Sequence, residues 1–116
     1  MKKITVYHNP QWGKSRGAVQ LLKENGIEPE IIQYLKTPPD VNELNDLSIM
    51  MGLRPKEFVR RNETEFKENN LVQFLDNDNV LFRAMVKYPK IMERPIIVCG
   101  NKAVLGRPPE NVLTLL

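Results

Sequence analysis

The stretch ITVYHNPQWGKSRGAVQLLKENG, residues 4–26, decides the fold because its residue pattern changes twice. Residues 4–7 are β-branched and aromatic, which predicts a buried strand that stops before Asn9-Pro10. From Ser15 onward the apolar residues share one helical face, and Gly26 is suited to the left-handed position that ends a helix. The chain therefore opens with a strand, a loop and a helix.

The middle of the chain is predicted to be mostly helical. A short apolar run at residues 31–35 first predicts a second strand. Asp40 is then placed to cap a helix that closes at Gly52. Residues 54–75 carry scattered apolar side chains among charged ones, as expected of short helices. Asp78 is placed to cap one further helix.

The last part of the chain predicts a β-hairpin and a closing helix. Residues 96–99 and 102–105 are two strand-like runs, joined by Gly100-Asn101, a two-residue link that favours positive φ. The final helix runs through residues 112–116, and proline is tolerated in its first turn. A parallel strand–helix–strand unit followed by an antiparallel hairpin gives a mixed four-stranded sheet.

This order of elements predicts an α/β fold of the thioredoxin/glutaredoxin-like type with a helical insertion. The core is expected at about residues 1–37 and 91–116, and the insertion at about 38–90. A length of 116 residues favours a single domain over residues 1–116, which would bury roughly two-thirds of its unfolded surface.

Composition excludes several classes of site and partner. The net charge is +3 without runs of lysine and arginine, so charge alone indicates small anions as readily as DNA. Because no helix concentrates basic residues, we expect no nucleic-acid partner. One cysteine and one histidine cannot build a disulfide framework or a structural zinc site, and no bound metal or cofactor is expected. No segment resembles a signal peptide or a membrane span, so we expect a cytoplasmic protein without a membrane partner.

The loop at residues 7–16 follows the first strand and leads into the first helix. Unpaired N–H groups and the helix dipole attract an anion at such a place, and the loop is polar and basic. Its residues also have a purely local interpretation, with Ser15 as an N-cap and Gly13 as a turn residue. A phosphate loop is rejected because its pattern requires glycine at position 8, which is His8.

Several ordered motifs resemble the glutaredoxin-coupled arsenate reductase family from one end of the chain to the other. The resemblance implies a thioredoxin-like fold, arsenate or a related oxyanion as substrate, and reducing equivalents from glutathione and glutaredoxin. The motifs that carry it are Tyr7-His8-Asn9-Pro10, Lys14-Ser15-Arg16, Tyr34-Leu35 with Thr37-Pro38, Met51-Gly52, Arg60, Met92-Glu93-Arg94-Pro95-Ile96-Ile97-Val98, and Gly106-Arg107-Pro108-Pro109-Glu110 with Val112-Leu113.

In that family a loop cysteine attacks arsenate, and three arginines bind the oxyanion and stabilise the arseno-thiol intermediate. The resemblance assigns the oxyanion-binding role to Arg60, Arg94 and Arg107. Considered alone, Arg60 is a solvated surface charge next to another arginine. Arg94 is the best placed, because the fold would give it a cis peptide bond to Pro95 that faces the loop.

The resemblance also places His8 and Asn9 in the active loop and Ser15 as the serine that helps to activate the thiol. The nucleophile's position holds Trp12. An indole offers an N–H donor and no lone pair suited to displacement, so no arseno-thiol bond can form there. Cys99 is the only sulfur nucleophile left, and it is expected near the hairpin turn, away from the loop.

Two side chains of the loop also have less specific interpretations. Without the resemblance, His8 is an ordinary loop histidine. Trp12 would then be apolar surface that covers the site, and packing against Arg94 or Arg107 would hold that arginine by a cation–π contact without a ligand.

Three functional hypotheses follow. The first is an arsenate reductase family protein that binds an oxyanion but is catalytically impaired because Trp12 replaces the nucleophile. The second is a non-catalytic module like the Spx-like regulators that bind RNA polymerase, although the paired loop cysteines of those proteins are absent. The third is an active enzyme in which Trp12 is an engineered or erroneous residue.

Overall fold

The computed structural model describes residues 3–116, which form two compact units. The first unit holds the chain up to Thr37 together with Arg94–Leu116, and the second holds Pro38–Glu93. The expectation of a single domain over residues 1–116 stays a prediction, and its first two residues lie outside the described part. No helix in the described part is long and apolar enough to cross a membrane.

The first unit is built on a mixed four-stranded sheet, as the sequence predicted. Its strands are β1 (Ile4–Tyr7), β2 (Glu30–Ile32), β3 (Ile96–Cys99) and β4 (Lys102–Leu105), in the order β2-β1-β3-β4. β1 pairs in parallel with β2 and antiparallel with β3, and β3 pairs antiparallel with β4. The alternation of β-branched residues in β1 and β3 supplies side chains to both faces of this sheet.

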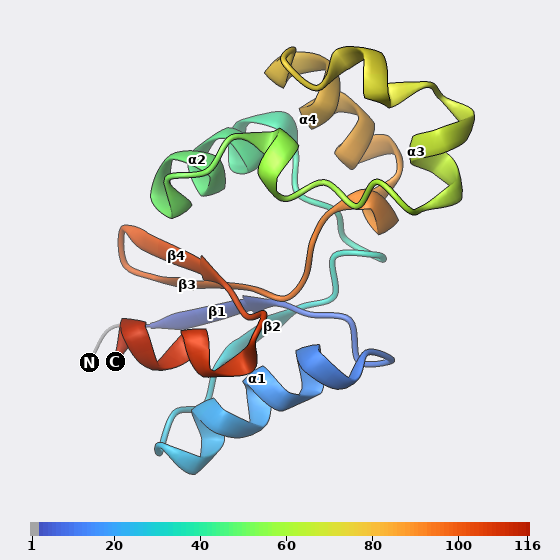
Figure 1. Cartoon of the computed structure of the whole chain (residues 1–116). Helices are drawn as coiled ribbons and strands as arrows, with labels where there is room; N and C mark the ends of the chain where they lie inside the picture. The colour runs from blue at the N-terminus through green and yellow to red at the C-terminus, as the bar shows by residue number, and fades with distance from the viewer. Residues whose placement is uncertain (1–2) are drawn as a thin grey trace. The chain divides into compact units, whose positions relative to one another are not determined.

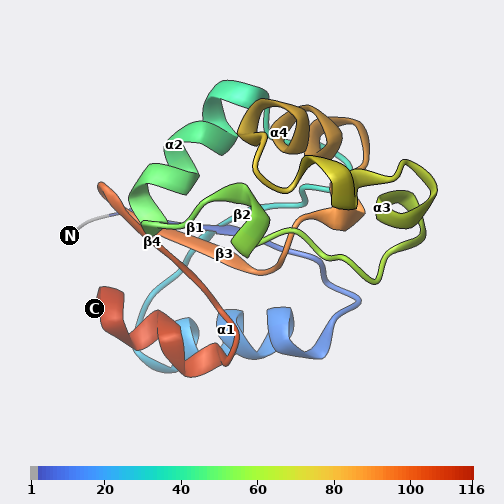
Figure 2. The same ribbon diagram turned by 45° about the horizontal axis from the view of Figure 1, so that its top comes forward.

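Two helices of the first unit, α1 (Gly13–Glu24) and the 3-10 helix η4 (Pro109–Leu115), lie on the same side of the sheet (Figures 1 and 2). They cover an apolar core in which burial of each leucine-sized side chain contributes about 2 kcal/mol. The core joins residues from β1, α1, β3 and η4, namely Ile4, Val6, Ala18, Leu22, Ile97, Cys99 and Val112.

The second unit is helical. Asp40 accepts the Glu43 N–H at 2.8 Å, which starts the first helix, and Gly52 ends it in the left-handed region at φ 68°. The last α-helix of this unit buries Leu81 and Met85 on its apolar face. The elements are α2 (Val41–Met51), η1 (Pro55–Glu57), α3 (Thr64–Glu68), η2 (Leu71–Phe74), α4 (Asp78–Lys87) and η3 (Pro89–Ile91).

Three local predictions were wrong. Ser15 is not an N-cap, because α1 begins earlier and Trp12 holds the cap position. The second strand ends at Ile32, since the residues after it turn away from the sheet. Asn77 rather than Asp78 caps α4, because its side-chain oxygen accepts the Val80 N–H at 3.2 Å.

Candidate functional site

The loop between β1 and α1 is held by its own hydrogen bonds. The His8 N–H donates to the Ile32 carbonyl at 2.8 Å, which ties the start of the loop to β2. Asn9 is buried, its side-chain oxygen accepts the Gln11 N–H at 3.1 Å, and its carbonyl accepts the Trp12 N–H at 3.1 Å. The backbone of this polar loop is therefore fixed before any ligand binds.

His8 and Ser15 form a hydrogen-bonded pair inside the loop. The distance from His8 Nδ1 to Ser15 Oγ is 2.6 Å, and the same buried oxygen accepts the Asn9 N–H at 3.1 Å. With that acceptor site occupied, the Ser15 hydroxyl can donate its hydrogen to a neutral His8 ring. Burial, and then the charge of Arg16, lowers the pKa of His8 below its ordinary value of 6.5, which favours this neutral form.

The N-terminus of α1 is positive in charge. Its first turn contains no acidic residue, and Trp12, at the N-cap position, makes no capping hydrogen bond with its side chain. Lys14 and Arg16 lie in this turn, and Arg16 Nη1 donates to the Pro10 carbonyl at 3.0 Å. Basic side chains together with the positive end of a helix favour the approach of an anion.

Arg94 lies against Trp12. The guanidinium carbon of Arg94 is 3.6 Å from the centroid of the indole ring, which confirms a predicted cation–π contact. Arg94 is only 3% exposed, whereas Trp12 is 38% exposed. The peptide bond from Arg94 to Pro95 is cis, as predicted. The structure thus places a buried cation beside Trp12 at the start of α1.

The segment that carries Arg107 runs next to the one that carries Arg94. The Gly106 N–H donates to the Pro95 carbonyl at 2.8 Å, and a Cβ atom at Gly106 would lie 2.6 Å from Pro95 Cγ. Arg107 itself is exposed, and its carbonyl accepts a hydrogen bond from the side-chain amide of Asn111 at 3.2 Å. Glycine is needed at position 106 because no other residue permits this close approach.

Arg60 belongs to the second unit and is engaged there by carboxylates. Its Nε lies 3.2 Å from Glu63 Oε1 and its Nη1 lies 3.1 Å from Glu93 Oε1. The Arg60 side chain is 16% exposed, so the interpretation of Arg60 as a solvated surface charge is wrong. The structure describes Arg94 and Trp12 together in one unit and Arg60 in the other, so a joint anion site of all three arginines stays a prediction.

A small cavity of about 110 Å³ opens beside the loop in the first unit. It combines the His8 ring with side-chain amides, one lysine and an apolar rim. A ligand in this cavity would therefore meet neutral hydrogen-bonding groups and the cation of one lysine. Its lining residues are His8, Asn9, Pro10, Gln11, Gln33, Leu35 and Lys36.

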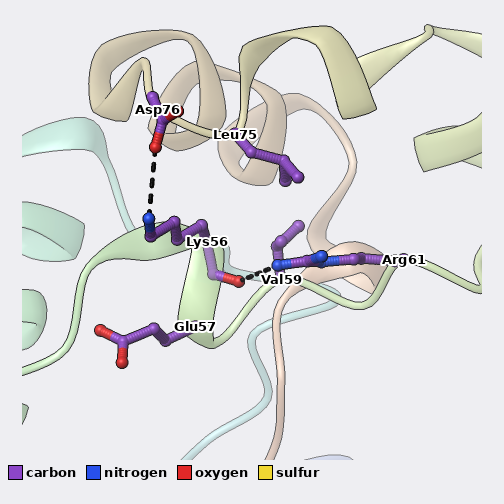
Figure 3. Close-up of a pocket in the computed structure, with 6 residues that line it drawn as sticks. All are labelled: Lys56, Glu57, Val59, Arg61, Leu75 and Asp76. Carbon is purple, nitrogen blue, oxygen red and sulfur yellow. Dashed lines mark hydrogen bonds and ion pairs between the residues drawn. The ribbon is translucent and has the colours of Figure 1, made fainter.

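A larger cavity of about 620 Å³ lies in the second unit and contains no predicted site residue (Figure 3). Lys56 and Asp76 form an ion pair at 3.2 Å there, and Arg61 Nη2 donates to the Lys56 carbonyl at 3.1 Å. Figure 3 shows the side chains of Val59 and Leu75 pointing toward one another beside the Lys56–Asp76 pair. Each of its two basic side chains thus contacts an acceptor group of the same unit.

Cys99 lies at the far end of the sheet from the loop. It is buried and pairs with Ile4, whereas Ile96 pairs with Tyr7, after which the loop begins. At about 3.3 Å per residue, Cys99 is roughly 10 Å along the strand from that end. Among the described residues, no group of three or more histidine, cysteine and acidic side chains is placed to hold a metal ion.

Two contributors to the site were not predicted from the sequence. Arg16 donates to the loop carbonyl of Pro10 and, after burial, contributes to the lowered pKa of His8. Gly106 lets the Arg94 and Arg107 segments approach one another. The available signals were a basic residue in the first turn of α1 and a glycine directly before an arginine.

Comparisons with known proteins agree with this architecture. The model of the ArsC family matches residues 7–115. The protein YfgD of Escherichia coli strain K12 is 47% identical over 116 residues, covering 99% of this chain and 98% of that protein. An arsenate reductase of Neisseria meningitidis is 42% identical over 118 residues, covering all of both chains.

Solved structures give the same result. An arsenate reductase from Vibrio cholerae superposes with a TM-score of 0.95 and 44% sequence identity, covering 99% of this chain and 98% of that one. The match therefore includes the sheet, both flanking helices and the helical insertion. Sequence and structure together show that the chain is a member of the ArsC family with a thioredoxin-like fold.

Proposed function

We propose that this ArsC family protein binds arsenate or a related tetrahedral oxyanion at the start of α1 without reducing it. The observation that carries the proposal is the contact between Arg94 and Trp12, because a cation is retained beside a position that has no nucleophile. The relatives named arsenate reductase support an oxyanion as the ligand. Arsenate, phosphate and sulfate share the shape and charge that such a site recognises.

The anion would be bound by charge and by hydrogen bonds. Arg94 is the first ligand, and we assign a supporting role to Arg107 from its family motif. His8, Asn9 and Ser15 shape the loop, since their mutual hydrogen bonds fix its backbone. Guanidinium groups suit this ligand because their planar donor forks match two oxygens at once.

Reduction fails in this proposal because the first covalent step has no nucleophile. A thiol that attacks arsenate forms a sulfur–arsenic bond and releases one arsenate oxygen as water. The Trp12 indole cannot form such a bond, and Cys99 is buried at the other end of the sheet. Glutathione and glutaredoxin, the electron donors that the family resemblance implies, would find no arseno-thiol to reduce.

Calorimetric titration of the chain with arsenate and with phosphate tests the binding claim. We expect a micromolar dissociation constant for at least one of these anions. Arg94→Ala should abolish the binding, because it removes the buried cation. The matched control is Arg83→Ala, since Arg83 is an exposed arginine of α4 in the second unit. Absence of binding, or equal binding by Arg94→Ala, would contradict the proposal.

A further inference from the structure

We infer that the small cavity beside the loop binds a short aliphatic carboxylate, at a site separate from the oxyanion contacts proposed for Arg94. The walls of this cavity come from the loop after β1 and from the turn after β2, and both belong to the first unit. The inference does not depend on the proposed function, because neither Arg94 nor Arg107 lines this cavity.

Hydrogen bonds fix both walls of the cavity. The Gln33 carbonyl accepts the N–H groups of Lys36 and Thr37, each at 2.9 Å, which closes the turn after β2. The His8 N–H donates to the Ile32 carbonyl at 2.8 Å and joins this turn to the opposite wall. A ligand therefore enters a space that is already shaped, and its binding costs little ordering of the backbone.

The charge of the cavity favours an anion. Lys36 lines it and forms no ion pair within the described residues 3–116, and no acidic side chain of that range lines it. Arg16 adds a second positive charge close to the His8 ring. A single ammonium group matches one carboxylate, whereas the planar forks of guanidinium groups match a tetrahedral oxyanion.

The His8 ring supplies a hydrogen-bond donor to the same ligand. Ser15 is fully buried, so its hydroxyl hydrogen needs an acceptor, and His8 Nδ1 lies 2.6 Å from Ser15 Oγ. A neutral ring that accepts at Nδ1 carries its proton on Nε2. Since His8 lines the cavity, Nε2 is the nitrogen that can donate to a carboxylate there. The side-chain amides of Gln11 and Gln33 add two neutral donors.

The apolar rim favours a carboxylate with a carbon chain over an inorganic anion. Leu35 lines the cavity and is 39% exposed, and the Pro10 ring belongs to the opposite wall. A volume of about 110 Å³ corresponds to roughly four water molecules, which suits a carboxylate with two or three further carbons. Each methylene group that is fully buried against this rim should strengthen binding about fourfold.

NMR titrations with butyrate, acetate and the uncharged analogue butyramide test this site at constant ionic strength. We expect millimolar binding of butyrate, binding of acetate about fourfold weaker, and binding of butyramide about tenfold weaker. Saturable shifts of the His8 ring protons locate the ligand, because His8 is the only histidine of the chain. Equal binding of butyramide and butyrate, or the absence of a shift at His8, overturns the inference.

Substitution of Lys36 tests the charged contact. Lys36→Gln should raise the dissociation constant of butyrate about fivefold, because it removes the ammonium group. Lys23→Gln is the matched control, since Lys23 is an exposed lysine in the last turn of α1, and it should leave the constant unchanged. Equal effects of the two substitutions overturn the inference.

Substitution of Leu35 tests the apolar rim. Leu35→Ala should reduce the preference for butyrate over acetate and leave acetate binding unchanged, because acetate has no chain to pack against the rim. Leu113→Ala is the matched control, since Leu113 is an apolar side chain of the first unit with a similar exposure of 43%. An unchanged preference in Leu35→Ala overturns the assignment of this rim.

Two further titrations separate this site from its alternatives. N-acetylvaline carries its carboxylate at a peptide-like end, and binding tighter than that of butyrate would overturn the assignment to a free acid. Phosphate should leave the dissociation constant of butyrate unchanged, and competitive displacement overturns the claim of a separate site. Failure of the chain to bind phosphate or arsenate would defeat the proposed function alone and leave this inference standing.

Discussion

His8 is the only histidine of the chain, and its surroundings favour the neutral ring. It is half-buried, it hydrogen-bonds Ser15, and its pKa is lowered first by burial and then by Arg16. Between the lowered pKa and about 6.5, the unfolded chain binds more protons at this residue than the folded chain does. His8 therefore contributes to a stability that is complete above about pH 6.5 and declines as the pH falls.

The prediction for His8 concerns this slope. The free energy of unfolding should decrease between about pH 7.5 and about pH 5.5, and His8→Gln should make the decrease smaller because glutamine does not titrate. Urea denaturation at the two pH values measures the difference. A direct check is the NMR titration of the His8 ring, which should show a pKa below 6.5. A ring that titrates above 6.5 would contradict the assigned environment.

Arg60 is a cation whose surroundings are charged. Two carboxylates face its guanidinium, and all three side chains are largely buried. Removal of the cation would leave Glu63 and Glu93 without its compensating charge in a poorly solvated place. The structural role of Arg60 within the second unit is thus independent of any role in anion binding.

We predict that Arg60→Met lowers the free energy of unfolding by about 1–3 kcal/mol, because methionine keeps much of the apolar stem but removes the charge. Urea denaturation at neutral pH measures this change. Arg83→Met is the control, since Arg83 is exposed and its replacement should change stability by less than about 0.5 kcal/mol. Equal effects of the two substitutions would show that the ion pairs of Arg60 contribute nothing specific.

At the scale of the elements, the sequence predicted those features that depend on neighbouring residues. The β1 strand, the cap at Asp40, the ends at Gly26 and Gly52, and the hairpin turn at Gly100 all follow from short-range rules, and the structure confirms them. The sheet order also followed, because a strand–helix–strand unit and a hairpin leave few ways to join four strands.

The failures at this scale occur where local preferences compete. Asn77 and Asp78 are both good caps, and the sequence alone could not choose between them. Ser15 looks like a cap, but its hydroxyl is used by His8 and Asn9, so the helix starts before it. The partner of Arg60 at Glu93 is 33 residues away in the chain and depends on how the second unit folds.

Gly106 links two elements, and its replacement tests that link. A Cβ atom there would lie 2.6 Å from Pro95 Cγ and 2.8 Å from Ile97 Cδ1, so the two segments must separate. We predict that Gly106→Ala lowers the free energy of unfolding by about 1–3 kcal/mol. It should also weaken oxyanion binding, because the Arg94 segment moves with Pro95.

Gly13→Ala is the matched control for stability. The nearest atom to a Cβ at that position is Arg16 Nη2 at 3.8 Å, an ordinary contact. Its effect on the free energy of unfolding should stay within about 0.5 kcal/mol. Thermal or urea unfolding of both variants measures the comparison. A Gly106→Ala variant as stable as Gly13→Ala would contradict the close packing described for the β3 and β4 ends.

At the scale of the whole molecule, the chain keeps the fold of the ArsC family over nearly its whole length. The match to the ArsC family extends over residues 7–115, and the thioredoxin-like core keeps the cation Arg94 at the start of α1. Sequence alone identified the loop and the arginines through their motifs. It left open whether Trp12 contacts Arg94 or Arg107, because that choice depends on how two distant segments pack.

The central claim is that this fold binds an oxyanion but cannot form an arsenic–sulfur bond. Its most direct test is a coupled arsenate reduction assay with glutathione and glutaredoxin, run on the chain and on Trp12→Cys. A cysteine there would sit at the start of α1 beside Arg94, where its thiol pKa should fall below about 8.5. We predict arsenite formation by Trp12→Cys and none above the blank by the chain itself. Sustained arsenate reduction by the unsubstituted chain would contradict the account.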